Sequence, residues 1–266
     1  MTAEAIRVSA GWLDLREGAD AAARNQALVG QLRRRLPPGP QMIHDLACGS
    51  GAMGRWLAPL LPGPQRWILH DRDADLLARA AADLPEGPAV EVVTRLSDIT
   101  LLAPEDFTGA TLITASALLD LLTGDELAAL ARACAQAGCP VLLTLSVTGC
   151  VRLDPADQLD ARISAAFNAH QRRMTPRGRL LGPDAVDAAV DSFRALGAEV
   201  VVAPSPWRLG PAETDLAVEW LAGWIGAARE QEPELALDLY GRRRLREAET
   251  GRLSVTVDHA DLLVLP

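Results

Sequence analysis

The amino-acid sequence predicts an α/β protein built on a doubly wound, mostly parallel sheet of seven strands with helical insertions. Short apolar runs alternate with helical segments along most of the chain, which is typical of such a sheet. A glycine-rich turn, Gly49-x-Gly51-x-x-Gly54, follows the first run, where a helix should begin. Acidic residues end the first three runs, and right-handed crossovers bring such strand ends to one edge of the sheet. We therefore expect a ligand site at that edge.

The elements are expected in the following order. An amphipathic helical segment over residues 12–36 comes first, and the Pro-Pro-Gly-Pro sequence that starts at Pro37 ends it. Apolar runs then predict strands at residues 41–45, 66–70, 90–95, 111–114, 141–147, 199–203 and 253–265. Helical periodicity predicts helices after Gly51 and over residues 75–83, 125–136, 183–197, 211–230 and 233–249. Pro59 should kink or shorten the helix after the glycine turn, since it lacks a backbone N–H.

The whole chain of 266 residues is interpreted as one domain, because no linker-like stretch divides it. Residues 1–40 are expected to form an N-terminal helical cap, and residues 41–147 the ligand-binding core. Residues 148–182 are interpreted as a lid insertion. Residues 183–266 form the C-terminal half, with a helical insertion over residues 211–250.

Composition excludes several classes of function. The net charge is −9, which argues against nucleic acid as a partner because phosphate binding needs clustered positive charge. The chain contains no lysine, so Schiff-base chemistry is excluded. The four cysteines lack zinc-type spacing, and no metal site is expected. No signal-peptide pattern or membrane-spanning apolar run is present, so we expect a cytoplasmic protein that does not associate with membranes.

The glycine-rich turn carries the most specific pattern in the chain. Its glycines allow positive φ angles and let a ligand lie directly against the backbone. Asp45 stands four residues ahead of Gly49, and the segment Asp45-x-Ala47-Cys48-Gly49-x-Gly51 resembles motif I of the class I S-adenosylmethionine-dependent methyltransferases. The resemblance covers about residues 40–147. It implies a Rossmann-like fold, S-adenosylmethionine as the cofactor, and a last strand inserted antiparallel between the two strands before it.

The resemblance also assigns roles to residues at the strand ends. Asp45 would meet the ammonium group of the cofactor's methionine moiety, and Asp71 would accept hydrogen bonds from the ribose hydroxyls. Asp98 would accept from the adenine amino group, with Ile99 packed on the ring. The full set of expected cofactor-binding residues is Asp45, Ala47, Gly49, Ser50, Gly51, Asp71, Arg72, Asp98, Ile99, Ala115 and Ser116.

The acceptor side is marked less clearly. His170 and Asp120 are the candidate catalytic bases, because either could take a proton near neutral pH in a suitable environment. Asn168 and Arg173 could orient a carboxylate or carbonyl group, and Trp207 could form an aromatic wall. The alternative for residues 167–173 is an ordinary lid helix with polar residues facing water. Arg16, Asp20 and Arg24 are further candidates, as a cover for the methionine carboxylate.

The leading hypothesis is methyl transfer to a small-molecule acceptor by in-line displacement, in a monomer or homodimer. The sequence after the fourth predicted strand lacks the Asn/Asp-Pro-Pro-aromatic tetrapeptide of enzymes that methylate nucleobase amino groups. One alternative is a regulatory or partner protein that binds S-adenosylmethionine without catalysis. The other is an NAD(P)-dependent oxidoreductase, which would use the three glycines and Asp71 but leave Asp45 and Asp98 without a role.

Overall fold

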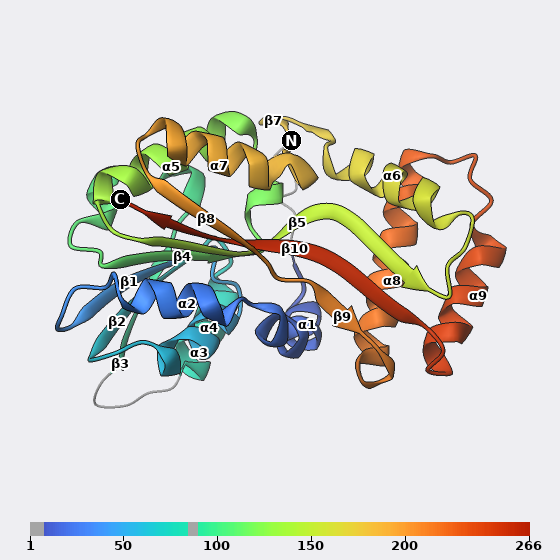
Figure 1. Cartoon of the computed structure of the whole chain (residues 1–266), viewed down its shortest axis with the longest axis horizontal. Coiled ribbons are helices and arrows are strands. Elements are labelled where there is room, and N and C mark those ends of the chain that lie inside the picture. Colours follow the sequence, from blue (N-terminus) through green and yellow to red (C-terminus); the bar gives the residue numbers. More distant parts are fainter. Residues whose placement is uncertain (1–7, 85–89) are drawn as a thin grey trace.

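The computed structural model describes residues 8–84 and 90–266 and contains one large mixed sheet (Figure 1). The strand order is β3-β2-β1-β4-β5-β10-β8, and a short eighth strand, β9, pairs with β10. Strands β1 to β5 run parallel, and β10 runs antiparallel between β5 and β8. The doubly wound fold and the antiparallel last strand are thus confirmed. The strands are β1 (Gln41–Leu46), β2 (Gln65–Asp71), β3 (Val90–Leu96), β4 (Leu112–Ser116), β5 (Val141–Asp154), β8 (Glu199–Pro204), β9 (Trp207–Leu209) and β10 (Ser254–Leu265).

Helices cover both faces of the sheet, as the alternating pattern predicts. They are α1 (Ala10–Ala23), α2 (Gln26–Arg33), α3 (Ala52–Leu57), α4 (Ala74–Asp83), α5 (Gly124–Ala137), α6 (Asp160–Gln171), α7 (Ala185–Ala195), α8 (Thr214–Gln231) and α9 (Asp238–Glu249). The prediction of a single helical segment over residues 12–36 is wrong in one respect, because the structure has two helices there. Asn25 breaks it: its side-chain oxygen accepts hydrogen bonds from two backbone amides and caps the start of α2. As expected, Pro59 ends α3 early, in a short 3₁₀ turn.

The hydrophobic core lies on both faces of the sheet. On one face, Phe193 of α7 and Leu262 of β10 belong to a cluster with α5. On the other, Leu32 of α2 and Trp67 of β2 pack with Leu263 of β10. Successive residues of β10 therefore face opposite layers, as the alternation of side chains along a strand requires. Each fully buried apolar side chain of this size contributes about 1.5–3 kcal/mol.

The strand β5 is longer than the sequence analysis predicts. It continues past Val147 to Asp154, because β10 stays paired with it as far as the Asp154–Ser254 position. The two strands leave the main sheet as a ribbon, and α6, α8 and α9 lie around its far end (Figure 1). Their buried side chains form a separate cluster that includes Trp224 and Tyr240. We call the ribbon end with β9, α6, α8 and α9 the second lobe.

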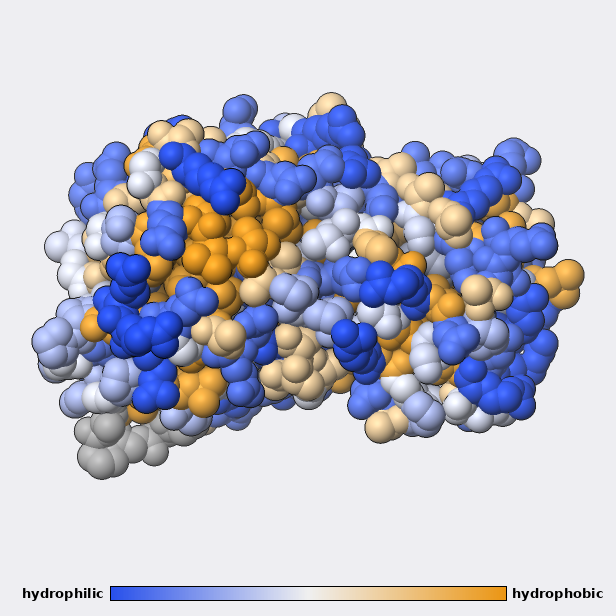
Figure 2. All heavy atoms as spheres, viewed as in Figure 1, coloured by the Kyte–Doolittle hydropathy of each residue, from blue (hydrophilic) through white to orange (hydrophobic). Residues whose placement is uncertain are grey.

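The surface is mostly hydrophilic, and a broad apolar area is visible on the left of the face shown in Figure 2. This area lies between α7 and α2, where β8 forms an edge of the sheet, and Val202 is 44% exposed there. No helix in the described part of the chain is long and apolar enough to cross a membrane.

Candidate functional site

The carboxyl ends of β1, β2, β3 and β4 meet at one edge of the sheet, as the sequence predicts. Asp45 lies near the end of β1, Asp71 ends β2, and Ser116 ends β4. Asp98 follows β3 by two residues and caps a short 3₁₀ turn. The paired registers place these strand ends side by side, with β1 between β2 and β4.

The glycine-rich turn between β1 and α3 has the backbone that its sequence predicts. Ala47, Gly49 and Gly51 all have positive φ angles, of 50°, 54° and 85°. At Gly51 a methyl group would lie 3.1 Å from the backbone of Ala80 on α4, so only glycine fits without strain. The turn therefore presents bare backbone at the sheet edge, where a ligand could lie against it.

Asp71 links the glycine turn to the start of α4. One carboxylate oxygen accepts the Gly49 N–H at 2.8 Å, and the other accepts the Asp73 N–H at 2.9 Å. The residue is buried, so its orientation is fixed. Each carboxylate oxygen has a second lone pair, and Asp71 can still accept one hydrogen bond on each oxygen.

Asp45 is a buried carboxyl group with one unused oxygen. Its Oδ1 accepts the Thr114 hydroxyl at 2.9 Å, whereas Oδ2 has no hydrogen-bond partner among residues 8–84 and 90–266. Burial raises the pKa of Asp45 to about 7, although the Thr114 hydrogen bond and the charge of Arg24 oppose the shift. A cation beside Oδ2 would favour the ionised form. The site thus contains a buried acceptor without a partner.

Arg24, at the end of α1, supplies the opposite charge. One Nη donates to the Ser116 hydroxyl at 3.1 Å, and the guanidinium lies 5.2 Å from the centre of the Trp56 ring. The Nε and the other Nη are buried and have no partner in the described residues. Burial lowers the pKa of Arg24, and the charges of Asp20 and Asp45 act against that shift. Buried donors without partners are costly, and two such nitrogens on one guanidinium could donate to an anion.

The remaining expected cofactor residues lie around this edge. Ile99 is buried beside Asp98, whose Oδ1 accepts the backbone N–H and the hydroxyl of Thr100 at 3.0 and 2.7 Å. The Ser50 hydroxyl is buried without a partner in the described part of the chain. Ala115 is buried within β4, and Arg72 is exposed directly after Asp71. The structure thus brings the expected cofactor residues to one edge.

Asp120 lies just beyond that edge, in the 3₁₀ turn that follows β4. Burial raises its pKa to about 6, while the charges of Arg16 and Arg173 partly oppose the shift. A carboxyl group with this pKa is largely ionised at neutral pH and is still basic enough to accept a proton. It follows β4, the strand that pairs with β1 and its glycine turn, whereas His170 lies on α6.

The other acceptor candidates take part in contacts of the second lobe. His170 on α6 lies 3.1 Å from Glu230 on α8, and Asn168 donates to the Gly149 carbonyl at 2.8 Å. Trp207 is buried on β9, and its indole N–H donates to Asp20 of α1 at 2.9 Å. Arg173 donates to the backbone carbonyl of His170 at 3.3 Å. The His170, Asn168 and Trp207 contacts thus join α6 to α8, α6 to β5 and β9 to α1, whereas the Arg173 hydrogen bond is local.

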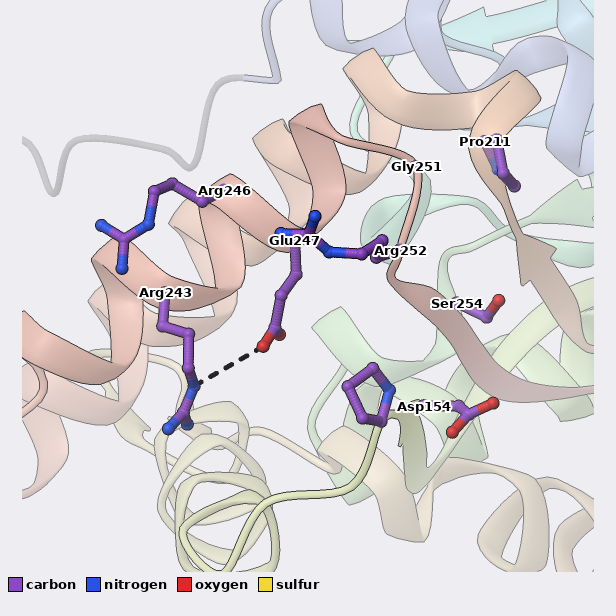
Figure 3. Close-up of a pocket in the computed structure, with 9 residues that line it drawn as sticks. Asp154, Pro211, Arg243, Arg246, Glu247, Gly251, Arg252 and Ser254 are labelled. Atoms are coloured by element: carbon purple, nitrogen blue, oxygen red, sulfur yellow. Dashed lines mark ion pairs between the residues drawn. The ribbon is translucent and has the colours of Figure 1, made fainter.

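A hollow of about 610 Å³ lies at the far end of the second lobe (Figure 3). Two of the residues that line it, Arg243 and Glu247, form an ion pair, with Arg243 Nε 3.7 Å from a carboxylate oxygen of Glu247. The residues that line it are Asp154, Pro155, Pro211, Arg243, Arg246, Glu247, Gly251, Arg252 and Ser254. None of them belongs to the glycine turn or to the carboxyl ends of β1 to β4. We therefore place the functional site at the sheet edge and not in this hollow.

Comparisons with known proteins agree with this fold. No protein-family model and no curated protein sequence matches the chain. Mycolic acid cyclopropane synthase in its apo form is similar over 97% of this chain and 100% of its own, with 12% identity and a TM-score of 0.51. A Bacillus halodurans protein that is provisionally named a methyltransferase is similar over 90% of this chain and 97% of its own, with 15% identity and a TM-score of 0.50. The YcgJ protein from Bacillus subtilis is also similar over 90% of this chain and 97% of its own, with 13% identity and a TM-score of 0.50.

The strand order and these similarities identify the fold. Five parallel strands, an antiparallel strand between β5 and β8, and a glycine turn after β1 are all present. The chain has the fold of the class I S-adenosylmethionine-dependent methyltransferases.

Proposed function

We propose that this protein is a methyltransferase that uses S-adenosylmethionine to methylate a small-molecule acceptor. The proposal rests on two ionisable side chains at the sheet edge: within residues 8–84 and 90–266, Asp45 has one buried oxygen without a partner and Arg24 has two buried nitrogens without one. An amino-acid end group, with one ammonium and one carboxylate, complements both. Asp71, at the neighbouring strand end, accepts one backbone N–H on each carboxylate oxygen, and the second lone pair of each oxygen suits a vicinal diol.

These residues would hold the cofactor along the sheet edge. Asp45 would pair with its ammonium, Arg24 with its carboxylate, and Asp71 with its ribose hydroxyls. Asp98 retains one carboxylate oxygen for the adenine amino group, and Ile99 lies beside it. When bound, S-adenosylmethionine supplies an electrophilic methyl group on a positively charged sulfur.

The protein would contribute positioning and a base. Holding the acceptor in line with the methyl group contributes roughly 7–11 kcal/mol to catalysis. We assign the base to Asp120, because it follows β4 next to Ser116 and has a pKa of about 6. His170 of α6, by contrast, lies within hydrogen-bond distance of Glu230 on α8, in the second lobe. The acidic net charge favours a small molecule over nucleic acid as the acceptor.

Replacing Asp120 by asparagine tests this assignment. With labelled S-adenosylmethionine and a panel of small hydroxyl-bearing acceptors, we expect Asp120→Asn to lower kcat about 10²- to 10⁴-fold. The wild-type rate should rise with pH up to about 6 and then level off, because the base works only when deprotonated. The variant should lose this rise.

The matched control is Asp125→Asn, an exposed aspartate at the start of α5 that should leave the rate unchanged. Full activity of the Asp120 variant would remove Asp120 from the mechanism. If the protein binds S-adenosylhomocysteine but transfers no methyl group to any acceptor, the alternative of a non-catalytic binding protein is favoured.

A further inference from the structure

Helix α1 lies between the glycine turn and the second lobe, and its two sides make contacts of different kinds. Toward the second lobe its contacts are mainly apolar, since Trp12, Leu15, Ala19 and Ala23 pack against the cluster that contains Trp207. One buried hydrogen bond, from the Trp207 indole N–H to Asp20, is added to them. Toward the sheet core, α1 meets α3 and α4 mainly through ion pairs. Exposed ion pairs are weak and are screened by salt, whereas apolar burial is not. The contact of α1 with α3 and α4 is therefore weaker than its contact with the second lobe.

The first ion pair joins α1 directly to the glycine turn. Both carboxylate oxygens of Glu17 accept from Arg55 on α3, at 2.8 and 2.6 Å. The same guanidinium donates to the Ser50 carbonyl within the turn at 2.5 Å. The second ion pair joins Asp14 to Arg79 on α4, at 3.0 and 2.5 Å. The four side chains are 20–46% exposed, so water can solvate them when the pairs separate.

Between these ion pairs, Leu13 lies directly on the turn. Its Cδ1 is 3.2 Å from the position that a β-carbon on Gly49 would occupy. A ligand held against the Gly49 backbone must therefore share this surface with Leu13. In this arrangement α1 lies against the turn, through Leu13 and the Glu17–Arg55 ion pair.

The end of α1 offers a point about which it could turn. The helix stops at Arg24, and Asn25 is fixed to the core by a hydrogen bond from its backbone N–H to Asp261 at 2.7 Å. The Asn25 side chain also donates to the Pro204 carbonyl at 3.2 Å. Asp14 lies ten residues from Arg24, about 15 Å along the helix. A small rotation at Arg24 would thus open both ion pairs.

We propose that α1 is a hinged cover of the cofactor site, latched to the core by the Glu17–Arg55 and Asp14–Arg79 ion pairs. The proposal rests on the proposed function, because it takes the glycine turn as the cofactor site. The cofactor or its product enters and leaves when the two latches separate, while α1 keeps its apolar contacts with the second lobe. Release of the product is then faster whenever the latches are weakened.

The test is the rate of S-adenosylhomocysteine release, followed by tryptophan fluorescence in a stopped-flow instrument. For the double variant Asp14→Asn/Glu17→Gln we expect the dissociation rate constant to rise about three- to tenfold. Raising the salt concentration should speed release from the wild type and have little effect on the variant, because salt screens only the intact latches. The matched control is Asp238→Asn, which removes an exposed ion pair to Arg229 in the second lobe.

Equal dissociation rate constants in the double variant, the control and the wild type would overturn the proposal. A dissociation rate constant of the wild type that does not change with salt concentration would also overturn it. If the wild type fails to bind S-adenosylhomocysteine at all, the proposed function itself fails, and the cover fails with it. Thermal unfolding of each variant shows whether a changed rate reflects a loss of fold.

Discussion

We expect Arg244→Met to lower the free energy of unfolding by about 3–5 kcal/mol, because it breaks a buried ionic network from one side. The Arg244 side chain is 1% exposed and lies on α9 in the second lobe. It donates to both carboxylate oxygens of Asp160 at 2.7 and 2.8 Å and to the Pro155 carbonyl at 2.7 Å. Without it, the carboxylate of Asp160 loses its only paired positive charge in the described residues and keeps two neutral donors, the Tyr240 hydroxyl at 2.6 Å and the Asp157 N–H at 2.8 Å. Urea-induced unfolding of both proteins measures the difference.

The neighbouring Arg243 provides the control on the same helix. Its side chain is 44% exposed and pairs with Asp157, so Arg243→Met should cost no more than about 1 kcal/mol. Equal losses for the two substitutions would show that the burial of the Arg244 network does not stabilise the second lobe.

A second large effect is expected for Arg24→Met, on affinity for S-adenosylhomocysteine. The substitution removes the buried N–H groups that have no partner and that we assign to the carboxylate. A charge-assisted hydrogen bond contributes about 1.5–3 kcal/mol, so the dissociation constant should rise about 10- to 100-fold. Titration calorimetry on both proteins measures this change.

5′-Methylthioadenosine serves as the control ligand, because it has the nucleoside but no carboxylate. Its affinity should be the same for the wild type and the Arg24 variant. If both ligands weaken equally, Arg24 supports the site as a whole and does not bind the carboxylate. If neither weakens, the unpaired N–H groups have no role in binding.

The backbone around the proposed cofactor site could be predicted from the sequence, because the signals there are local. Each parallel strand from β1 to β4 is a short apolar run, and the acidic residue at or after its end can be read directly. The positive φ angles at Gly49 and Gly51 follow from the glycines themselves. Parallel topology then brings Asp45 and Asp71 to one edge without further information.

The rest depends on contacts between distant parts of the chain. Apolar residues continue at helical spacing on both sides of Asn25, so the periodicity hides the break between α1 and α2. Beyond Val147 the sequence becomes polar, and β5 continues only because β10, about a hundred residues later, pairs with it. Arg24 carries no motif of its own. The sequence suggests it as a candidate, and only the structure shows its burial, its contact with Trp56 and the charges around it.

The most direct measurement of the central claim is titration calorimetry of the purified protein with S-adenosylhomocysteine, with NAD in parallel. We predict one-to-one binding of S-adenosylhomocysteine, no binding of NAD, and loss of S-adenosylhomocysteine binding in Asp71→Ala, which removes the carboxylate assigned to the ribose hydroxyls. Binding of NAD alone would contradict it, because Asp45, Arg24 and Asp98 would then have no part in holding the ligand.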